Sequence, residues 1–261
     1  MTMMFLPNGQ TVMYDCNITE DNKNRALSYL TEIMNTHNRN KIDVFINSHR
    51  DADHMRGIKI IHAHYPIQKI WDSGVPGTTP DSQKYFDYMD LRRNIGYEEI
   101  KPHSRWTFGD VIIRIFNSKR KNGPDDANYH SIVIKAEYGK SSVILAGDTT
   151  ADVWKDEIIP KYADVDFSTN ILLASHHGSL GFFDDPRDEK NYFTEHIKKM
   201  APDVTVISVR ENDSLPHGKA IEIYEKYTSG VSGTKIYRTD KLGHIKFEMK
   251  LEGGGTISHR N

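Results

Sequence analysis

The sequence predicts an α/β fold built from two mixed β-sheets with helices on their outer faces. Early segments alternate between short apolar strands and amphipathic helices, whereas later segments read as hairpins, and this mixture is typical of two sheets in one pair of layers. The chain has 261 residues, 37% of them hydrophobic, which suits a single large domain over residues 1–261. Polar clusters follow several of the apolar strands, where α/β proteins usually bind ligands.

The first half of the chain alternates strands and helices. "TVMYD" at 11–15 predicts a strand, and an amphipathic helix follows near Asn24–Asn35, with its apolar residues on one side. The next elements are a buried strand in "IDVFINS", a short helix in "GIKIIHAHYP" that ends at Pro66, a strand in "IQKIWDS" and a helix over Asp81–Asn94.

The second half begins with two predicted hairpins, in "WTFGDVIIRIFNS" and "HSIVIKAEYGKSSVILAGD". The second hairpin turns at Tyr138-Gly139-Lys140, because glycine is a strong turn signal. The remaining predicted elements are a helix (151–163), a strand (170–175), a helix (193–200), a strand (204–209), a helix (219–228) and a final hairpin (235–250).

Composition excludes several classes of protein. No apolar stretch is long enough to cross a bilayer, and the N-terminus lacks the basic and apolar regions of a signal peptide, so we expect a cytoplasmic protein without a membrane partner. Cys16 is the only cysteine, which excludes an intrachain disulfide and a Cys-rich zinc site; we expect it to be a small buried hydrophobe. With a net charge of −2, a nucleic-acid partner would need a local basic patch.

The strand that ends at Asn47 is followed by the cluster His49, Asp51, Asp53 and His54, in the pattern H-x-D-x-D-H. Ligands at i, i+2, i+4 and i+5 in an irregular loop can converge on two adjacent positions. Imidazole and carboxylate together suit zinc, manganese or iron. A single aspartate or histidine at a strand end is usually a cap or turn residue, but four ligands within six residues predict a metal centre.

Three later loops also follow apolar runs: "GDTT" after "SVILA", "SHHGS" after "NILLA" and "RENDSLPHG" after "VTVISV". Asp148 in the first could bridge two metals, and His176 or His177 in the second could complete the second metal. Two adjacent metals can activate a water molecule and bind the oxygens of an in-line displacement.

These motifs in this order, "NSHRDADHMRG", "ILAGDTT", "ILLASHHGS" and "ISVRENDSLPHG", resemble the metallo-β-lactamase superfamily. More narrowly, the chain resembles the metallo-hydrolase domain of bacterial competence DNA-uptake channels and its stand-alone relatives, which has H-x-D-x-D-H where most of the superfamily has H-x-H-x-D-H. The late "YRTDKLGHI" resembles the closing hairpin of that subgroup, and the resemblance covers nearly all of the chain, from Phe5 to Phe247. It implies an αββα sandwich with a dinuclear site between the tops of the two sheets.

The resemblance also implies roles for individual residues. His49 and Asp51 match the ligands of the first metal, and Asp53 and His54 match those of the second. Asp148 matches the bridging aspartate, and we expect turnover to depend on Asp53 and Asp148.

The late histidine ligand comes from the "HHGS" pair, in which we favour His176 over His177. His217 in "LPHG" is expected to line the site, where the superfamily often uses a histidine to bind metal or to touch the reacting group.

The chain departs from the family pattern in two places. Where the superfamily has a further histidine ligand, this chain reads "DDANYHSIVI"; Asn128 fits the asparagine of the subgroup, and His130 is the other candidate. Relatives usually have an extra strand before "LPNGQTVMYDCN", so either the site lacks that contribution or the true start lies upstream. Asp15 matches a position close to the metals, with a turn aspartate as the alternative.

Basic and aromatic residues near the motifs are candidates for substrate binding. Arg50, Arg56 and Arg210 could neutralise phosphates, whereas Lys119–Lys121 fits a solvated loop slightly better. Phe182 and Phe183 are expected to be exposed after the metal loop, either to stack a base or to pack the loop down. The histidines without a partner motif are expected on the surface: His37, His62, His64, His103, His196, His244 and His259.

The leading functional hypothesis is a phosphodiesterase, specifically a nuclease that acts on DNA or RNA through a metal-activated water with two divalent ions, manganese or zinc. The alternatives are a hydrolase of a small ester, lactone, thioester or β-lactam, and a non-catalytic metal-binding regulatory module. Asp51 and Asn128 replace imidazoles, which favours manganese over zinc; the alternative is a zinc hydrolase in which Asp51 is a variant ligand.

Overall fold

The structure is a computed structural model that describes residues 1–119, 123–124, 126–185 and 191–260. The chain folds into two compact units. Unit 1 comprises Met1–Pro102 and Ser118–Ile132, and unit 2 comprises His103–Asn117 and Val133–Asn261. The prediction of one domain over residues 1–261 stays a prediction. Within the described ranges, none of the helices combines the length and the apolar character that crossing a membrane requires.

Unit 1 contains a five-stranded sheet, in which β1 is antiparallel to β2 and the other neighbours are parallel. Its strands in spatial order are β1 (Thr2–Phe5), β2 (Thr11–Tyr14), β4 (Val44–Ile46), β5 (Ile70–Asp72) and β6 (Tyr97–Glu99). Strand β1, which precedes the segment "LPNGQTVMYDCN", was not predicted from the sequence. A two-residue strand, β3 (Cys16–Asn17), bridges to Met55 and Arg56.

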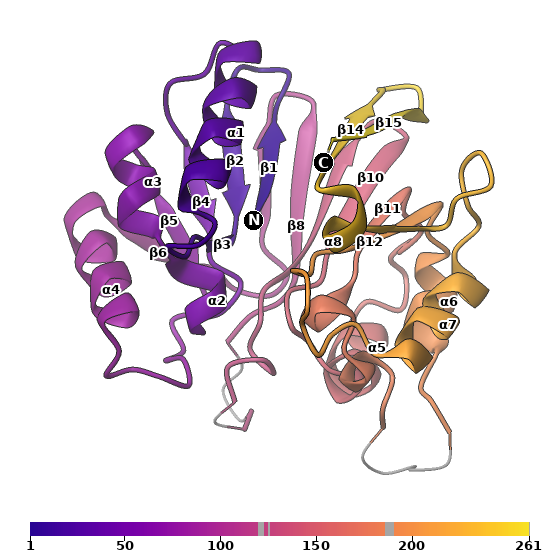
Figure 1. The fold of residues 1–261 in the computed structure, drawn as a ribbon. Helices are drawn as coiled ribbons and strands as arrows, with labels where there is room; N and C mark the ends of the chain where they lie inside the picture. Colours follow the sequence, from indigo (N-terminus) through magenta and orange to yellow (C-terminus); the bar gives the residue numbers. More distant parts are fainter. Residues whose placement is uncertain (120–122, 125, 186–190, 261) are drawn as a thin grey trace. The chain divides into compact units, whose positions relative to one another are not determined.

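Helices cover one face of this sheet (Figure 1). The helices of unit 1 are α1 (Lys23–Thr36), α2 (Ala52–Met55), α3 (Ile58–His64) and α4 (Gln83–Ile95). Met13 lies opposite Phe45, and Phe45 opposite Ile70, so these three side chains share a face of the pleated sheet. The buried residues of α1, α3 and α4 pack against them, including Leu30, Met34, Ile61, Tyr88 and Leu91.

Unit 2 contains a seven-stranded mixed sheet. Its strands in spatial order are β13 (Ile236–Arg238), β12 (Val204–Ile207), β11 (Ile171–Leu173), β10 (Ser141–Leu145), β9 (Val133–Tyr138), β8 (Val111–Asn117) and β7 (Arg105–Phe108). Strands β10 to β13 are mutually parallel, and β7 to β10 form antiparallel pairs, which confirms both predicted hairpins.

The helices of unit 2 are short. They are a π-helix (Val153–Ile158) that continues into α5 (Ile159–Lys161), the 3-10 turns Ser175–Gly178 and Leu180–Phe182, α6 (Glu195–Met200), α7 (Gly218–Tyr227) and α8 (Thr239–Leu242). A two-stranded hairpin, β14 (His244–Met249) and β15 (Gly255–Arg260), packs Ile245, Phe247 and Ile257 near the apolar residues of β11 to β13.

The predicted final hairpin over 235–250 is wrong. Ile236–Arg238 joins the large sheet parallel to β12, with Val206 opposite Tyr237, and the hairpin begins only at His244. The Thr239 hydroxyl group contributes to this pairing, because it donates to the Val209 carbonyl and accepts from the Val209 amide. The alternating apolar residues suited either partner, and the sequence did not show which one pairs.

The parallel strands place the polar loops of each unit at one edge of its sheet. In unit 1, Asp15 follows β2 and the cluster that begins at His49 follows β4. In unit 2, Asp148 follows β10, the His176–His177 pair follows β11, and the loop with His217 follows β12. Because carboxyl ends of parallel strands meet at the same edge, the predicted gathering of loops is confirmed within each unit.

Candidate metal centre

Two histidines of unit 1 lie close together after the end of β4, with their rings tilted by 49°. The ring centroids of His49 and His54 are 4.0 Å apart. The Nδ1 atom of His54 lies 2.8 Å from Oδ2 of Asp15, and the Nδ1 atom of His49 lies 2.9 Å from the Ser48 hydroxyl oxygen. The Ser48 hydroxyl in turn lies 2.7 Å from the same Asp15 oxygen.

This network assigns the ring protons. The Ser48 hydroxyl donates to Asp15 and accepts from Nδ1–H of His49, while Nδ1–H of His54 donates to Asp15 directly. Both rings then present the lone pair of Nε2. Metal-binding histidines usually donate their other ring N–H to a carboxylate or carbonyl group in this way. Asp15 therefore orients both imidazole rings, the ring of His54 directly and that of His49 through Ser48.

Each of these imidazoles has a carboxylate beside its Nε2 atom. Oδ2 of Asp51 lies 3.7 Å from Nε2 of His49, and Oδ2 of Asp53 lies 3.7 Å from Nε2 of His54. Two ligands that bind one ion at about 2.0–2.2 Å lie roughly 3–4 Å apart. The two pairs, His49 with Asp51 and His54 with Asp53, are the pairs that the resemblance implies, and their donor atoms fit divalent metal ions.

Unit 2 contains a second group of candidate ligands. Nε2 of His176 lies 3.8 Å from Oδ2 of Asp148, a separation that also suits a shared ion. The Ser175 hydroxyl lies 3.0 Å from the Gly147 carbonyl and 2.7 Å from the Thr149 carbonyl, and the His176 amide donates to Gly147 at 3.0 Å. The "SHHG" turn is therefore held against the "GD" turn.

The backbone of this turn is strained. His176 and His177 have φ values of 46° and 53°, in the left-handed region that residues with a Cβ atom rarely occupy. Nδ1–H of His177 donates to the Ser208 carbonyl at 2.7 Å, which places the ring lone pair of His177 on Nε2. His176 has the contact with Asp148, whereas His177 has the fixed ring, so the preference for His176 stays a prediction.

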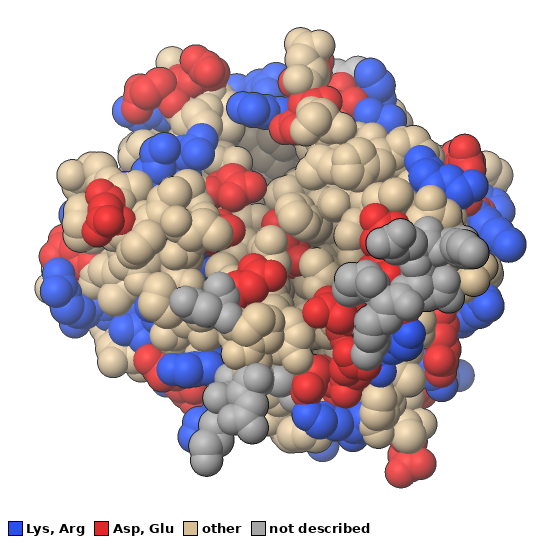
Figure 2. Space-filling view, turned by 90° about the horizontal axis from the view of Figure 1, so that it is seen from below, with Lys and Arg blue, Asp and Glu red and all other residues tan. Residues whose placement is uncertain are grey.

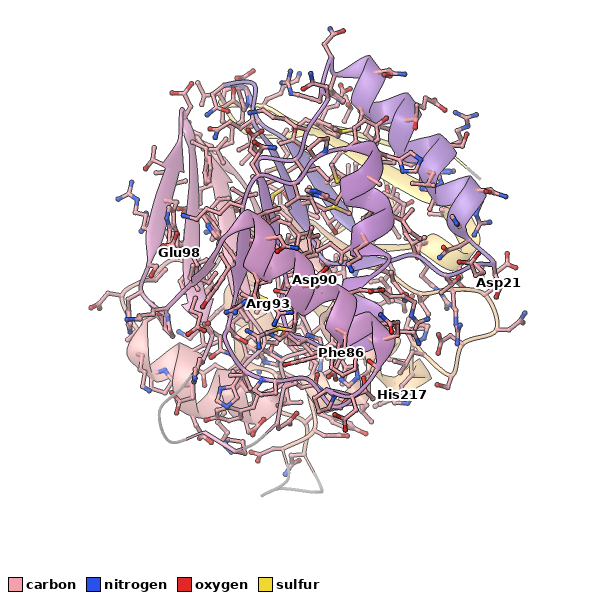
Figure 3. The ribbon with its side chains drawn as sticks, turned by 90° about the vertical axis from the view of Figure 1, so that its left-hand side faces the viewer. Asp21, Phe86, Asp90, Arg93, Glu98 and His217 are labelled. Carbon is pink, nitrogen blue, oxygen red and sulfur yellow. The ribbon has the colours of Figure 1, made fainter. Side chains whose placement is uncertain are left out.

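His217 lies in the same unit and caps α7 with an exposed side chain (Figure 3). Its Nδ1 atom accepts a hydrogen bond from the Leu180 amide at 2.9 Å, and its own amide donates to the Gly178 carbonyl at 3.1 Å. The neutral ring therefore carries its proton on Nε2, where it can donate to a substrate oxygen.

The structure separates the two candidates for the additional ligand. Nε2 of His130 donates to the Pro124 carbonyl at 2.8 Å and so holds its own loop together. The Oδ1 atom of Asn128 is buried and has no hydrogen-bond partner among the described residues. The Ile132 amide, in the same segment as Asn128, donates at 2.8 Å to the carbonyl of Ser48, which directly precedes His49. Asn128 is therefore the better candidate.

The predicted phosphate-binding arginines have different surroundings. The guanidinium group of Arg50 is buried in unit 1 and donates to Asp72 at 3.0 Å, so this side chain holds the fold together. Arg210 is exposed and pairs with Asp213 at 3.0 Å. On the face drawn in Figure 2, lysine and arginine side chains lie among aspartate and glutamate side chains. Of the predicted basic loop, Lys119 is described, whereas residues 120 and 121 lie outside the described ranges.

Two expectations about surface residues are wrong. Phe182 and Phe183 are fully buried, and they pack with Tyr224 and Trp154 of the same unit, so they hold the loop down and are not free to stack a base. His196 is also buried, stacked on the Phe193 ring at 5.0 Å. Burial lowers the pKa of His196 to about 3. These side chains fill the interior beside α6 and α7.

Two supporting groups were not found from the sequence. They are the Ser48 hydroxyl, which donates to Asp15, and the Thr78 amide, which donates to Oδ1 of Asp51 at 2.7 Å. Ser48 directly precedes His49 in the motif, which is the only signal the sequence offered. Nothing in the sequence marked Thr78.

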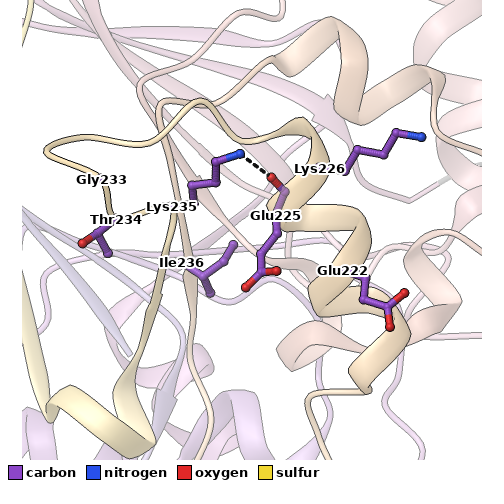
Figure 4. A pocket seen from close by; sticks show the side chains of 7 residues that line it. All are labelled: Glu222, Glu225, Lys226, Gly233, Thr234, Lys235 and Ile236. Atoms are coloured by element: carbon purple, nitrogen blue, oxygen red, sulfur yellow. Dashed lines mark hydrogen bonds between the residues drawn. The ribbon is translucent and has the colours of Figure 1, made fainter.

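A cavity of about 680 Å³ in unit 2 contains none of the predicted site residues (Figure 4). It is lined by Glu222, Glu225, Lys226, Gly233, Thr234, Lys235 and Ile236, and the Lys235 ammonium group donates to the Glu225 carbonyl at 2.8 Å. Two lysines and two glutamates line it, so the lining carries no net charge that would favour an anionic or a cationic ligand.

Comparisons with known proteins agree with the motifs. No model of a protein family matches the chain. ComE operon protein 3 of Bacillus subtilis is 22% identical over 216 residues, which cover 82% of this chain and 25% of that protein. Recombination protein 2 of Haemophilus influenzae is 26% identical over 223 residues, which cover 82% of this chain and 24% of that protein. The chain thus spans about a quarter of the length of these curated relatives.

Solved structures share the fold. YhfI from Bacillus subtilis, a metallo-β-lactamase fold protein, matches with a TM-score of 0.53 and 12% identity over 98% of this chain and 90% of YhfI. CmlA, a diiron β-hydroxylase from Streptomyces venezuelae, matches with a TM-score of 0.52 and 13% identity over 88% of this chain and 49% of CmlA. The resemblance predicted from the motifs is confirmed: the chain has the metallo-β-lactamase fold, and its sequence is similar to a segment of ComE operon protein 3 and of Recombination protein 2.

Proposed function

We propose that this chain is a metal-dependent hydrolase that cleaves phosphodiester bonds in nucleic acid. The observation that carries the proposal is the arrangement at the end of β4. Two imidazoles have their Nδ1 atoms committed to Ser48 and Asp15, and each Nε2 atom has a carboxylate oxygen 3.7 Å away. Such a donor set suits divalent metal ions and costs little reorganisation when they bind.

Each unit has its own candidate ligands for this function. In unit 1 they are His49, Asp51, Asp53 and His54, and in unit 2 they are Asp148 with His176 or His177. Bound divalent ions supply Lewis-acid activation of water and of phosphate oxygens. His217, with its proton on Nε2, would donate a hydrogen bond to the leaving oxygen and so stabilise the charge that develops there as the ester bond breaks.

The choice of nucleic acid rests on the sequence relatives and on chemistry. One relative is named a recombination protein, and recombination acts on DNA. Exposed Arg210 can approach a phosphate, whereas Arg50, buried on Asp72, gives no support to its predicted role in substrate binding. With a net charge of −2, the chain would hold a polyanion through local contacts such as Arg210 and the metals.

The experiment combines a metal measurement with a substrate panel. The purified chain is reconstituted with manganese or zinc, its metal content is measured, and it is assayed on single-stranded DNA, duplex DNA, RNA and a lactone. We expect bound metal and cleavage of an oligonucleotide. Asp53→Ala and Asp148→Ala should each lose metal and nearly all turnover, because a bridging or paired carboxylate offsets the repulsion between cations.

His176→Ala and His177→Ala are compared in the same assay, and the variant that loses metal identifies the ligand. Glu222→Gln, on the exposed surface of α7, is the matched control and should keep full activity. Hydrolysis of the lactone alone would replace nuclease activity with the small-ester alternative. A chain that binds no metal, or full turnover in Asp53→Ala, would refute the proposal altogether.

A further inference from the structure

Arg50 stands in the middle of the ligand run, between His49 and Asp51, yet its side chain does not accompany the ligands. The residue is 4% exposed, and its guanidinium group lies 3.0 Å from Oδ2 of Asp72 and 3.4 Å from the Tyr85 hydroxyl. Asp72 ends β5, the strand beside β4 in the sheet of unit 1. The loop that contains His49 and Asp51 is therefore fixed to the neighbouring strand through Arg50, the residue between these two candidate ligands.

Asp72 is fully buried and is held from several sides. Its carboxylate accepts hydrogen bonds from the Tyr88 hydroxyl at 2.7 Å, from Nε of Arg92 at 2.6 Å and from the Gly74 amide at 3.0 Å. Burial, and then the Asp72 charge, raise the pKa of Tyr88 well above its ordinary value, so Tyr88 stays a donor. Because the Tyr88 hydroxyl and Nε of Arg92 donate to Oδ2, the oxygen that Arg50 also contacts, they limit the positions that Arg50 can take.

The loop after β5 holds the same segment at its backbone. A Cβ atom at Gly77 would lie 1.8 Å from the Arg50 carbonyl oxygen, so only glycine allows this approach. The next amide, that of Thr78, donates to Oδ1 of Asp51 at 2.7 Å. That hydrogen bond leaves Oδ2 of Asp51 facing Nε2 of His49.

We infer that Asp72 and Gly77 are positioning residues for the metal ligand Asp51, and that Arg50 is an anchor for the loop and does not bind substrate. Asp72 fixes the side chain of Arg50, and Gly77 lets the Thr78 amide reach Asp51, so that one carboxylate oxygen is presented to an ion. The inference rests on the proposed metal-binding function, which it deepens by naming what sets the geometry of the first ligand pair.

The test measures metal affinity separately from folding. Asp72→Asn and Gly77→Ala are stripped with chelator and titrated with zinc and with manganese against a competing indicator, while urea unfolding of the apo-proteins reports their stability. Supporting groups of metal ligands typically contribute 10–100-fold to affinity. We therefore expect at least one equivalent of metal to bind about tenfold more weakly or worse, at a temperature where circular dichroism shows the variants folded.

Glu99→Gln is the matched control, because Glu99 pairs with Arg92 at 3.0 Å and no contact joins it to Arg50 among the described hydrogen bonds and ion pairs. It should leave the metal affinity unchanged. A double-mutant cycle adds a second readout. If Gly77 acts through Asp51, Gly77→Ala should change the affinity of an Asp51→Asn protein by less than twofold, since the two effects then overlap.

The outcomes separate the inference from the proposed function. If the wild-type protein binds no metal, both fail. If the wild-type protein binds metal and both variants bind it equally well, with only their unfolding free energy lowered, the positioning role is refuted and the metal site stands. If Gly77→Ala weakens binding equally with and without the Asp51 carboxylate, the route through Asp51 is refuted.

Discussion

At the residue scale, the Asp15 carboxylate fixes the proton of a histidine 39 positions further along the chain. Asp15→Asn keeps the size of the side chain, but the amide nitrogen that replaces one carboxylate oxygen can only donate. The Ser48 amide, the Ser48 hydroxyl and His54 then no longer all find an acceptor. We expect the apparent affinity for zinc or manganese to fall by about 10–100-fold, the usual effect of losing such a partner. Competition with a metal indicator measures this change.

The control for Asp15 is Asp21→Asn, which removes the same charge from an exposed position (Figure 3). It should change the metal affinity by less than twofold. If Asp15→Asn binds metal as tightly as the wild-type protein, Asp15 is a turn residue whose φ of 54° serves only the chain path after β2.

His196 should make the folded state sensitive to acid. Its pKa is about 3 in the folded protein, because burial disfavours the imidazolium form, against an ordinary value of 6.5. A lowered pKa means that the unfolded chain takes up the proton first. The contribution of neutral His196 to the free energy of unfolding is therefore complete above pH 6.5, and it is lost as the pH falls from 6.5 towards 3.

Urea unfolding of the wild-type protein and of His196→Phe tests this dependence. Between about pH 7.5 and pH 5, the wild-type protein should lose roughly 2 kcal/mol of unfolding free energy more than the variant loses. Phenylalanine suits the aromatic surroundings of Phe182, Phe183 and Phe193. Parallel losses in the two proteins would show that other groups cause the acid sensitivity.

At the scale of elements, the buried Ser175 hydroxyl helps to hold the turn Ser175–Gly178 against the "GD" turn. Ser175→Ala removes its contacts with the Gly147 and Thr149 carbonyls. We expect a loss of about 1–3 kcal/mol in unfolding free energy, the usual cost of leaving buried polar groups without a partner. We also expect lower metal occupancy, because His176 and Asp148 lie in the two turns that this hydroxyl joins.

Ser179→Ala is the matched control for Ser175. Among the residues that the structure describes, the Ser179 hydroxyl accepts from the Gly181 amide, at 3.2 Å, within its own turn. It should lower the stability slightly and leave the metal content unchanged. Equal metal content in Ser175→Ala and Ser179→Ala would show that the "GD" turn keeps its shape without this link.

Much of the element order could be predicted because the apolar periods are clear. The helix predicted at Asn24–Asn35 is α1, and the strand "IDVFINS" contains β4. The predictions that failed concern partners. The pattern at Ile236–Arg238 was equally compatible with pairing to β12 or to β14, and Phe182 looked exposed because polar residues follow it in the sequence. Tertiary packing decides such cases, and no local pattern records it.

At the scale of the whole molecule, the choice of metal is set by the complete ligand set. Asp51 and Asn128 stand where the wider superfamily has histidines, which favours cations that prefer oxygen ligands. We expect manganese to support more cleavage of a labelled oligonucleotide than zinc, and excess zinc to inhibit it. The measurement is a titration of the chelator-stripped protein with manganese, zinc, magnesium and cobalt.

Asp51→His should shift this preference towards zinc, since it restores an imidazole. Full recovery with stoichiometric zinc and none with manganese in the wild-type protein would contradict the prediction. An unchanged preference in Asp51→His would show that Asp51 is not a ligand.

The candidate ligands could be predicted from the sequence, but the contacts that hold them in place could not. The spacing of His49, Asp51, Asp53 and His54 indicated a metal centre, and the resemblance implied how they pair. The sequence did not show that Arg50 turns away from its neighbours onto Asp72, because that depends on a buried carboxylate 22 positions later. The role of Asp15 was visible only through the resemblance.

The path of the chain between the two units has a consequence for its synthesis. The chain leaves unit 1 after Pro102, returns after Asn117 and leaves again after Ile132. Unit 1 is completed only by that last segment, where the Ile132 carbonyl accepts from the Tyr14 hydroxyl at 2.6 Å. On the ribosome, β7 and β8 therefore emerge before their neighbour β9 and before unit 1 is whole. Neither unit can be released by a single cut, so both must mature as parts of one interleaved chain.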